Sequence, residues 1–115
     1  MVTLKTCLNR IRDLFNTDIY KCQAGTGTTA AMASNTGLET EDSNTLLDAT
    51  VVVTDKCVQV THTIASTIGE GEAYSEQEIQ INSGNTSANR IVHTALTKGA
   101  NDEYIYITNV FFNSV

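Results

Sequence analysis

Two histidines are the residues of this chain best suited to metal binding or proton transfer. His62 and His93 each fall in a segment of alternating polar and apolar residues, on the same face as the apolar ones. Such a histidine is usually a hydrogen-bonded core residue, and this is the role we expect for both. The alternative is a metal or ligand site, which would form if the two predicted strands were neighbours.

Acidic residues supply the next candidate chemistry. They occur in close pairs at three places, namely Glu70/Glu72, Glu76/Glu78 and Asp102/Glu103. Residues two apart in a strand project from the same face, so Glu76 and Glu78 could hold a cation between them. A solvated strand face explains the same spacing, and it is the interpretation that we favour.

Other catalytic patterns are missing from the sequence. Residues 25–29 (GTGTT) resemble a phosphate-binding loop, but the loop lacks the GK[ST] ending that such sites require. Cys7, Cys22 and Cys57 are odd in number and have no CxxC spacing, which argues against a disulfide framework and a structural zinc site. We therefore expect a protein that is not an enzyme, with no cofactor and no metal, made in a reducing cytoplasm.

The composition indicates one β-rich domain spanning residues 1–115. The chain is 12.4 kDa, rich in Thr, and free of Pro and Trp. A net charge of −6 argues against nucleic-acid binding, and no apolar run is long enough for a membrane span. The basic residues gather near the N-terminus, whereas Glu39, Glu41, Asp42 and Asp48 form an acidic cluster. This cluster is either a solvated loop or a surface that meets the basic N-terminus.

The first segment predicts an amphipathic helix over residues 3–15. Leu4, Leu8, Ile11 and Phe15 share one face, which we expect to pack on a sheet, and Thr3 is a candidate N-cap. Residues 16–18 then predict a break, and residues 19–22 a short strand.

Residues 23–49 are small and polar, with few large apolar anchors. A structureless stretch of this length is uncommon inside a compact domain. We expect either an arm that is ordered by contacts outside its own core or a long loop containing a short helix over residues 38–47.

From residue 50 to residue 112 the hydrophobic pattern has a period of two, interrupted by turn sequences. The predicted strands are residues 50–54, 57–66, 73–81, 90–97 and 103–112. This spacing is typical of an antiparallel β-sandwich or a barrel-like sheet. The predicted fold is therefore mainly β, with one N-terminal helix and a long arm or loop.

The last predicted strand is apolar on both faces. Tyr104, Tyr106 and Phe112 lie on one face, and Ile105, Ile107 and Phe111 on the other. Such a strand is either central between two layers or has one face against a partner. The second case predicts a homo-oligomer, for which we favour a trimer.

The order of these features resembles a family of small virion proteins of tailed bacteriophages. An N-terminal helix is followed by GTGTTA at residues 25–30 and by a segment ending LETE at residues 34–41. A Ser-Glu strand at residues 73–76 and an Arg-starting strand at residues 90–98 complete the pattern. The family pattern often continues Ser-Glu with an apolar stretch, whereas this chain has the more polar QEIQ at residues 77–80.

The resemblance implies a non-enzymatic structural protein of the virion, synthesised in the host cytoplasm. Its expected role is a capsid decoration or cement protein that binds itself and the major capsid protein. A neck, baseplate or tail-fibre adaptor subunit is the first alternative, and a small metal- or ligand-binding β-domain using His62 and His93 is the second. The residues that we expect at a partner interface are Gly25, Thr26, Gly27, Thr28, Thr29, Leu38, Glu39, Glu41, Tyr104, Tyr106 and Phe112.

Overall fold

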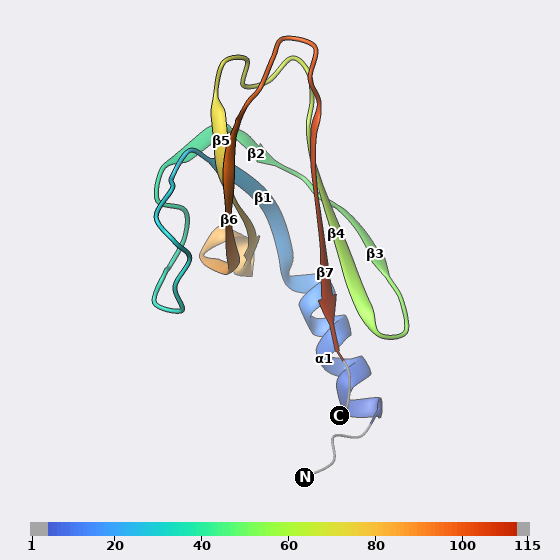
Figure 1. Cartoon of the computed structure of the whole chain (residues 1–115). Helices are drawn as coiled ribbons and strands as arrows, with labels where there is room; N and C mark the ends of the chain where they lie inside the picture. The colour runs from blue at the N-terminus through green and yellow to red at the C-terminus, as the bar shows by residue number, and fades with distance from the viewer. Residues whose placement is uncertain (1–4, 113–115) are drawn as a thin grey trace.

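The computed structural model describes residues 5–112, which form one helix and seven strands (Figure 1). The helix, α1, spans Lys5–Asp18. The strands are β1 (Ile19–Gly25), β2 (Glu41–Leu47), β3 (Thr50–Val53), β4 (Cys57–Ile64), β5 (Ala73–Ile81), β6 (Thr86–Thr97) and β7 (Tyr104–Phe111). A single 3-10 turn, η1 (Asn82–Gly84), connects β5 to β6.

The strands form two antiparallel sheets. Sheet A has the order β2-β1-β5-β6, and sheet B has the order β3-β4-β7. Their inner faces pack together, and the sheets do not close into a barrel. The prediction of a mainly β, sandwich-like fold with one N-terminal helix is therefore confirmed.

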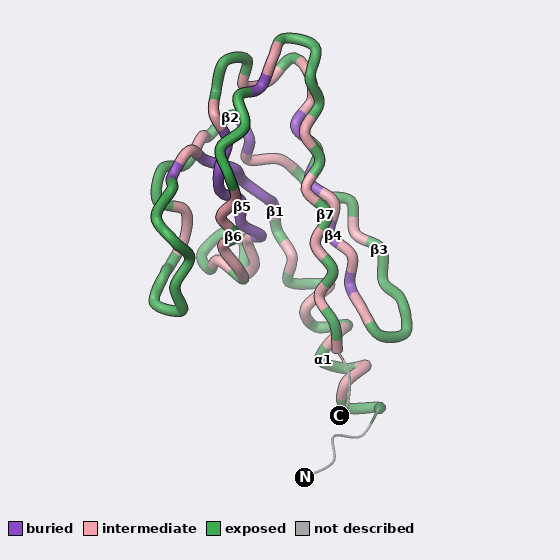
Figure 2. Tube along the Cα trace, viewed as in Figure 1, coloured by how far each residue is buried: buried purple, intermediate pink, exposed green. Residues whose placement is uncertain are grey.

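The core lies between the two sheets in two small apolar clusters. One contains Cys22, Val58, Val60 and Ile79, and the other contains Ala24, Ile64 and Tyr74. β4 buries every second side chain, as the alternating pattern predicted. β5 is buried along most of its length because sheet B covers one face and the loop between β1 and β2 contacts the other (Figure 2).

The helix continues to Asp18, so the predicted break at residues 16–18 is wrong. Thr17 lies in the last turn, and its hydroxyl is within hydrogen-bonding distance of the carbonyls of Asp13 (3.1 Å) and Leu14 (3.0 Å). The helix lies at one end of the molecule (Figure 1). Phe15 packs against Phe112 with ring centroids 5.8 Å apart. No residue in Lys5–Asp18 is buried. Of the face that was expected to pack on a sheet, Phe15 contacts the core, whereas Ile11 is 44% exposed. The expected N-cap, Thr3, lies outside the described residues.

Much of the predicted arm at residues 23–49 is strand. β1 extends to Gly25, and the chain returns as β2 from Glu41, pairing antiparallel with β1. The alternative of a short helix over residues 38–47 is therefore wrong, because these backbone groups pair with β1. What remains is the loop at residues 26–40, hereafter the β1–β2 loop, which extends from the side of sheet A (Figure 1).

The remaining strands agree closely with their predicted bounds, except at the start of β6. That strand begins at Thr86 rather than at Arg90, because the tight η1 turn returns the chain at once to pair with β5. Two non-glycine residues in this turn, Asn82 and Ser83, have positive φ angles.

Candidate functional site

The carboxylate of Glu76, in the middle of β5, binds both ends of the β1–β2 loop. Its Oε2 atom accepts hydrogen bonds from the backbone N–H groups of Gly27 (2.7 Å) and Thr40 (2.8 Å). Its Oε1 atom accepts from the backbone N–H of Glu39 (2.8 Å) and from Nε of Arg90 (2.9 Å). One buried side chain therefore receives four donors, three of which belong to the loop.

The glycines of the GTGTT segment are explained by this close approach. A Cβ atom at Gly27 would collide with Oε2 of Glu76 and with the side chain of Glu39. A Cβ atom at Gly25 would collide with the carbonyl oxygen of Thr40 and would lie 2.7 Å from Oε2 of Glu76. Both positions need glycine for space, so that the backbone can reach the carboxylate.

Arg90 supplies the balancing charge beneath the loop. Its side chain is 4% exposed, and its Nη1 atom also donates to Oδ1 of Asn35 in the β1–β2 loop (3.1 Å). A buried ion pair with this many hydrogen bonds is costly to break by removing one partner, because the other charge is left unpaired. The pair and the loop therefore depend on each other.

The interpretation of Glu76 and Glu78 as a solvated face is wrong. Both residues are buried. The β1–β2 loop lies over Glu76, and Oε1 of Glu78 accepts a hydrogen bond from the side-chain amide of Gln80 (2.9 Å). Burial alone would raise the pKa of Glu76, but the bonds from Thr40, Glu39, Arg90 and Gly27 outweigh it and lower that pKa. An ionised carboxylate with four donors suits anchoring of a loop better than proton transfer.

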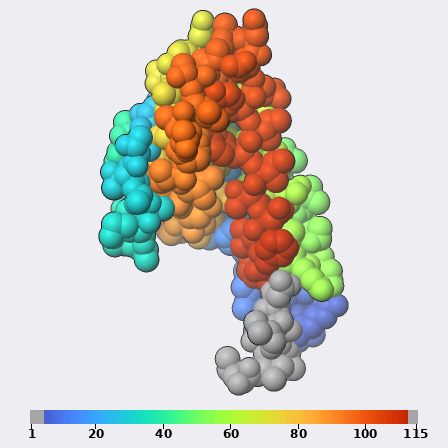
Figure 3. Space-filling model, in the orientation of Figure 1, coloured from blue at the N-terminus to red at the C-terminus, as the bar shows by residue number. Residues whose placement is uncertain are grey.

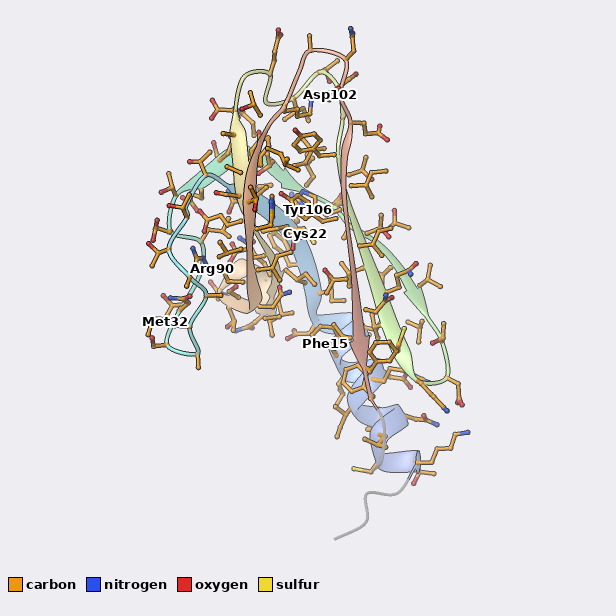
Figure 4. All side chains as sticks on the ribbon, in the orientation of Figure 1. Phe15, Cys22, Met32, Arg90, Asp102 and Tyr106 are labelled. Carbon is orange, nitrogen blue, oxygen red and sulfur yellow. The ribbon has the colours of Figure 1, made fainter. Side chains whose placement is uncertain are left out.

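The tip of the β1–β2 loop is an ordered turn that exposes an apolar side chain. The N–H of Asn35 donates to the carbonyl of Met32 (3.0 Å), and Oδ1 of Asn35 accepts from the N–H of Met32 (2.9 Å). Met32 is 63% exposed at the tip, away from both sheets (Figure 4). We expected an arm ordered by contacts outside its own core; in the structure, Glu76 and Arg90 of the same chain hold the loop.

The predicted interface residues in the β1–β2 loop and at the strand ends beside it fall into two groups. Gly25 and Gly27 are buried, so their role is to let the backbone approach Glu76. The others are at least partly accessible, namely Thr26, Thr28, Thr29, Leu38, Glu39 and Glu41.

The outer face of sheet B carries no charged side chain in its paired strands. β7 alternates between half-buried residues such as Tyr104 and Tyr106 and exposed residues (Figure 2). Ile105, Ile107 and Phe111 are 52%, 60% and 63% exposed. The register places the following residues on this outer face: Thr50 and Val52 of β3, Cys57, Gln59, Thr61 and Thr63 of β4, and Ile105, Ile107, Asn109 and Phe111 of β7.

The two predicted interface faces of β7 have different roles. Tyr104 and Tyr106 face the core, and Phe112 packs against the helix through Phe15. These three residues were expected at a partner interface, and the structure places them against the chain itself. The opposite face, with Ile105, Ile107 and Phe111, is the accessible one.

The two histidines lie on opposite sheets, with the ring of Tyr106 in contact with both. His62 is buried, as expected of a core histidine. Its Nε2–H donates to the carbonyl of Thr45 (2.9 Å), while Nδ1 lies 3.4 Å from the amide nitrogen of Gln77. His93 is half-buried and bonds the hydroxyl of Tyr106 through Nε2 (2.8 Å). These contacts indicate that both histidine rings serve packing and hydrogen bonding within the fold.

Nothing in residues 5–112 forms a cluster of three or more His, Cys, Asp or Glu side chains able to hold a metal ion. Burial raises the pKa of the Cys22 thiol to about 12, so this core cysteine stays protonated. No helix in the described part of the chain is both long and apolar enough to cross a membrane.

Comparisons with protein-family models, with curated proteins and with solved structures gave no match. Four separate motif segments meet at the Glu76 carboxylate, namely GTGTT, LETE, Ser-Glu and the part of β6 that contains Arg90.

Sequence reasoning missed the pairing of Glu76 with Arg90. Two features of the sequence could have indicated it. Glu76 lies in a predicted strand that also contains Gln77 and Ile79, and the glycine-rich segment at residues 25–29 had no explanation. Spacing alone did not reveal it, because the partners are separated by 14 to 49 residues along the chain.

Proposed function

We propose that this chain is a non-enzymatic structural subunit of a tailed-bacteriophage virion, where it binds the head shell as a decoration or cement protein. The observation that carries the proposal is the charge-free outer face of sheet B. A chain with a net charge of −6 keeps this one sheet face free of charge and exposes Ile105, Ile107 and Phe111 on it. An uncharged sheet face with several large, exposed apolar side chains is typical of a contact with another protein.

The β1–β2 loop supports an assembly role in a second way. A long loop held by a buried ion pair presents the uncharged turn at Met32 at a defined place. A rigid tip loses less conformational entropy on binding than a flexible one would. The loop is thus suited to contact a neighbouring subunit at a distance from the sheet face.

A neck, baseplate or tail-fibre adaptor subunit is the alternative, since the same face would serve there. The two locations separate in a sedimentation experiment with purified heads and purified tails that lack this protein, from the phage that encodes it. We expect the full chain to sediment with heads. Binding to tails alone would favour the alternative, and binding to neither would contradict both.

The sheet face itself is tested by a double variant, Ile105→Thr with Phe111→Thr. Threonine is suited to strands, so folding should be preserved while apolar contact area is lost. Ile91→Thr is the matched control, because Ile91 is 38% exposed on β6 of the other sheet and does not line the cavity that contains Ile105. We expect the double variant to lose head binding and the control to keep it. Equal binding by all three proteins would exclude this face as the docking surface.

A further inference from the structure

β7 is a free edge of sheet B along its whole length. It pairs with β4 through eight consecutive residues, from Cys57↔Phe111 to Ile64↔Tyr104, without a register shift. It is the last strand in the order β3-β4-β7, so its other side is unpaired within the described residues. Figure 3 shows β7 at the surface between β4 and β6; β6 belongs to sheet A and contacts β7 through side chains, as in the bond between His93 and Tyr106, but it does not pair with β7.

The backbone groups on this free side can be assigned from the ladder. Phe112 donates its N–H to the carbonyl of Lys56 (2.7 Å), which extends the β4–β7 pairing by one residue. In an antiparallel pair, alternate residues direct their N–H and C=O groups to the neighbouring strand. The even-numbered residues of β7 therefore bond to β4, and the odd-numbered ones, from Ile105 to Phe111, direct their groups to the open edge.

The other three edges formed by the described residues are protected. β2 begins with Glu41 and Asp42, and its pairing with β1 is irregular. β3 has only four residues, and the carbonyl groups of the turn that follows it accept hydrogen bonds from Arg12. β6 contains Arg90, and its pairing with β5 shifts register twice. Charges, short length and bulges are the usual means of preventing edge-to-edge pairing.

β7 has none of these protections. Its sequence, YIYITNVF, contains no charge, proline or glycine, and it is rich in aromatic and β-branched residues. A regular, exposed edge of this kind is a template for pairing with another strand. We propose that β7 pairs antiparallel with β7 of a second copy of this chain, around a twofold axis.

Charge favours a second copy over an unrelated partner. Two chains of net charge −6 repel each other, so they can meet closely only where neither has a charge. In a twofold pair each residue near the axis lies close to its own counterpart, and like charges opposite each other in a sheet are unfavourable. An uncharged strand in an acidic chain meets this condition, whereas a different partner would be selected through complementary charges.

The pair would join two copies of sheet B into one six-stranded sheet, β3-β4-β7-β7-β4-β3. The exposed faces around Ile105, Ile107 and Phe111 would then be continuous across the axis. A twofold pair gives an even-numbered assembly, in contrast to the trimer that the sequence favoured. This inference concerns the chain in solution and does not depend on the proposed place in a virion.

The test is the mass of the full chain in solution, measured by light scattering after size-exclusion chromatography at micromolar concentrations. We expect twice the 12.4 kDa of one chain. Ile107→Lys places a charge beside the proposed axis, and we expect it to weaken association by about tenfold or more. The matched control is Thr61→Lys, because Thr61 lies directly opposite Ile107 on the central strand of the same face.

Hydrogen exchange of the wild-type amides provides a readout that does not need a variant. We expect the N–H groups of Ile107 and Asn109 to be protected at high protein concentration and to exchange faster on dilution. A wild-type monomer, or unprotected amides at these positions in a dimer, would overturn the proposal. Dissociation by Thr61→Lys as strong as that by Ile107→Lys would place the contact on the sheet face instead of its edge. None of these results depends on whether the chain binds heads or tails.

Discussion

Oε2 of Glu76 lies 2.7 Å from the backbone nitrogen of Gly27, which precedes it by 49 residues in the chain. This hydrogen bond fixes the start of the β1–β2 loop to the middle of sheet A. The same carboxylate binds the end of the loop at Glu39 and Thr40, so the loop is closed by one side chain. The long loop is therefore part of the folded unit, although it packs few large apolar side chains.

Replacing Glu76 by Gln should destabilise the protein by about 3 kcal/mol, because Arg90 would be left as a buried charge without its partner. Urea unfolding of the purified chain measures this loss. Glu70→Gln is the control, since Glu70 is exposed in the loop before β5 and should change stability by less than about 0.5 kcal/mol. Equal stability of the two variants would contradict the anchoring role.

Acid should weaken the protein through the same carboxylate. The pKa of Glu76 in the folded chain lies below its ordinary value of 4.5, so folding favours the ionised form. Its contribution to stability is complete above pH 4.5 and is lost as the pH falls through the lower, folded-state pKa. The test is the urea midpoint of unfolding, measured from about pH 6 downward. We expect the midpoint to fall once the pH is below 4.5, the ordinary pKa of a glutamate. In Glu76→Gln the fall should be smaller.

Gly27→Ala should cost about 2 kcal/mol, because the added methyl group collides with the Glu76 carboxylate and the chain must shift. Gly37→Ala is the matched control in the same loop, where a Cβ atom would lie 3.6 Å from the nearest atom, Oε2 of Glu78. Limited proteolysis should cut the β1–β2 loop faster in Gly27→Ala than in Gly37→Ala. Similar cleavage rates would show that the loop does not depend on this contact.

Periodicity predicted most of the fold, because the side chains of β4 and β7 alternate in burial along each strand and because turn sequences bound β3 and β5. It failed for β2, whose sequence EDSNTLL has no alternation, since only the hydrogen bonds to β1 make it a strand. The prediction of the Glu76 site from the sequence failed for a related reason. Glu76 looked like a solvated acid, and nothing local to β5 shows that a loop 36 to 49 residues earlier covers it.

His62 should make stability depend on pH in a higher range. Burial lowers the pKa of this imidazole from 6.5, despite its hydrogen bond to Thr45, so the folded state favours the neutral ring. The contribution of the neutral His62 ring to stability is therefore complete above pH 6.5, and it is lost as the pH falls through the lower, folded-state pKa of this ring. His62→Gln should reduce this slope while costing about 2 kcal/mol at neutral pH through lost packing.

The matched variant of this test is His93→Gln, which leaves the buried His62 in place and should keep the slope. Metal analysis of the purified wild-type chain belongs to the same experiment. One stoichiometric zinc ion per chain, removed by either histidine variant, would contradict the assignment of both rings to packing.

Phe15→Ala should loosen the helix from the body of the protein. Phe15 contacts Phe112 and the cluster around Val58, and no residue of Lys5–Asp18 is buried, so this ring is the main apolar contact of the helix. The loss should be about 2 kcal/mol, less than for a fully buried ring, because Phe15 is half-buried.

Leu14→Ala is the control for the helix, since the neighbouring Leu14 is 52% exposed and should change stability by less than about 0.5 kcal/mol. Hydrogen exchange separates local from global effects. In Phe15→Ala the amides of α1 should exchange faster than those of β4 and β5, because the sheets retain their own core. Uniformly faster exchange in all three elements would instead show that the helix and the sheets unfold as one unit.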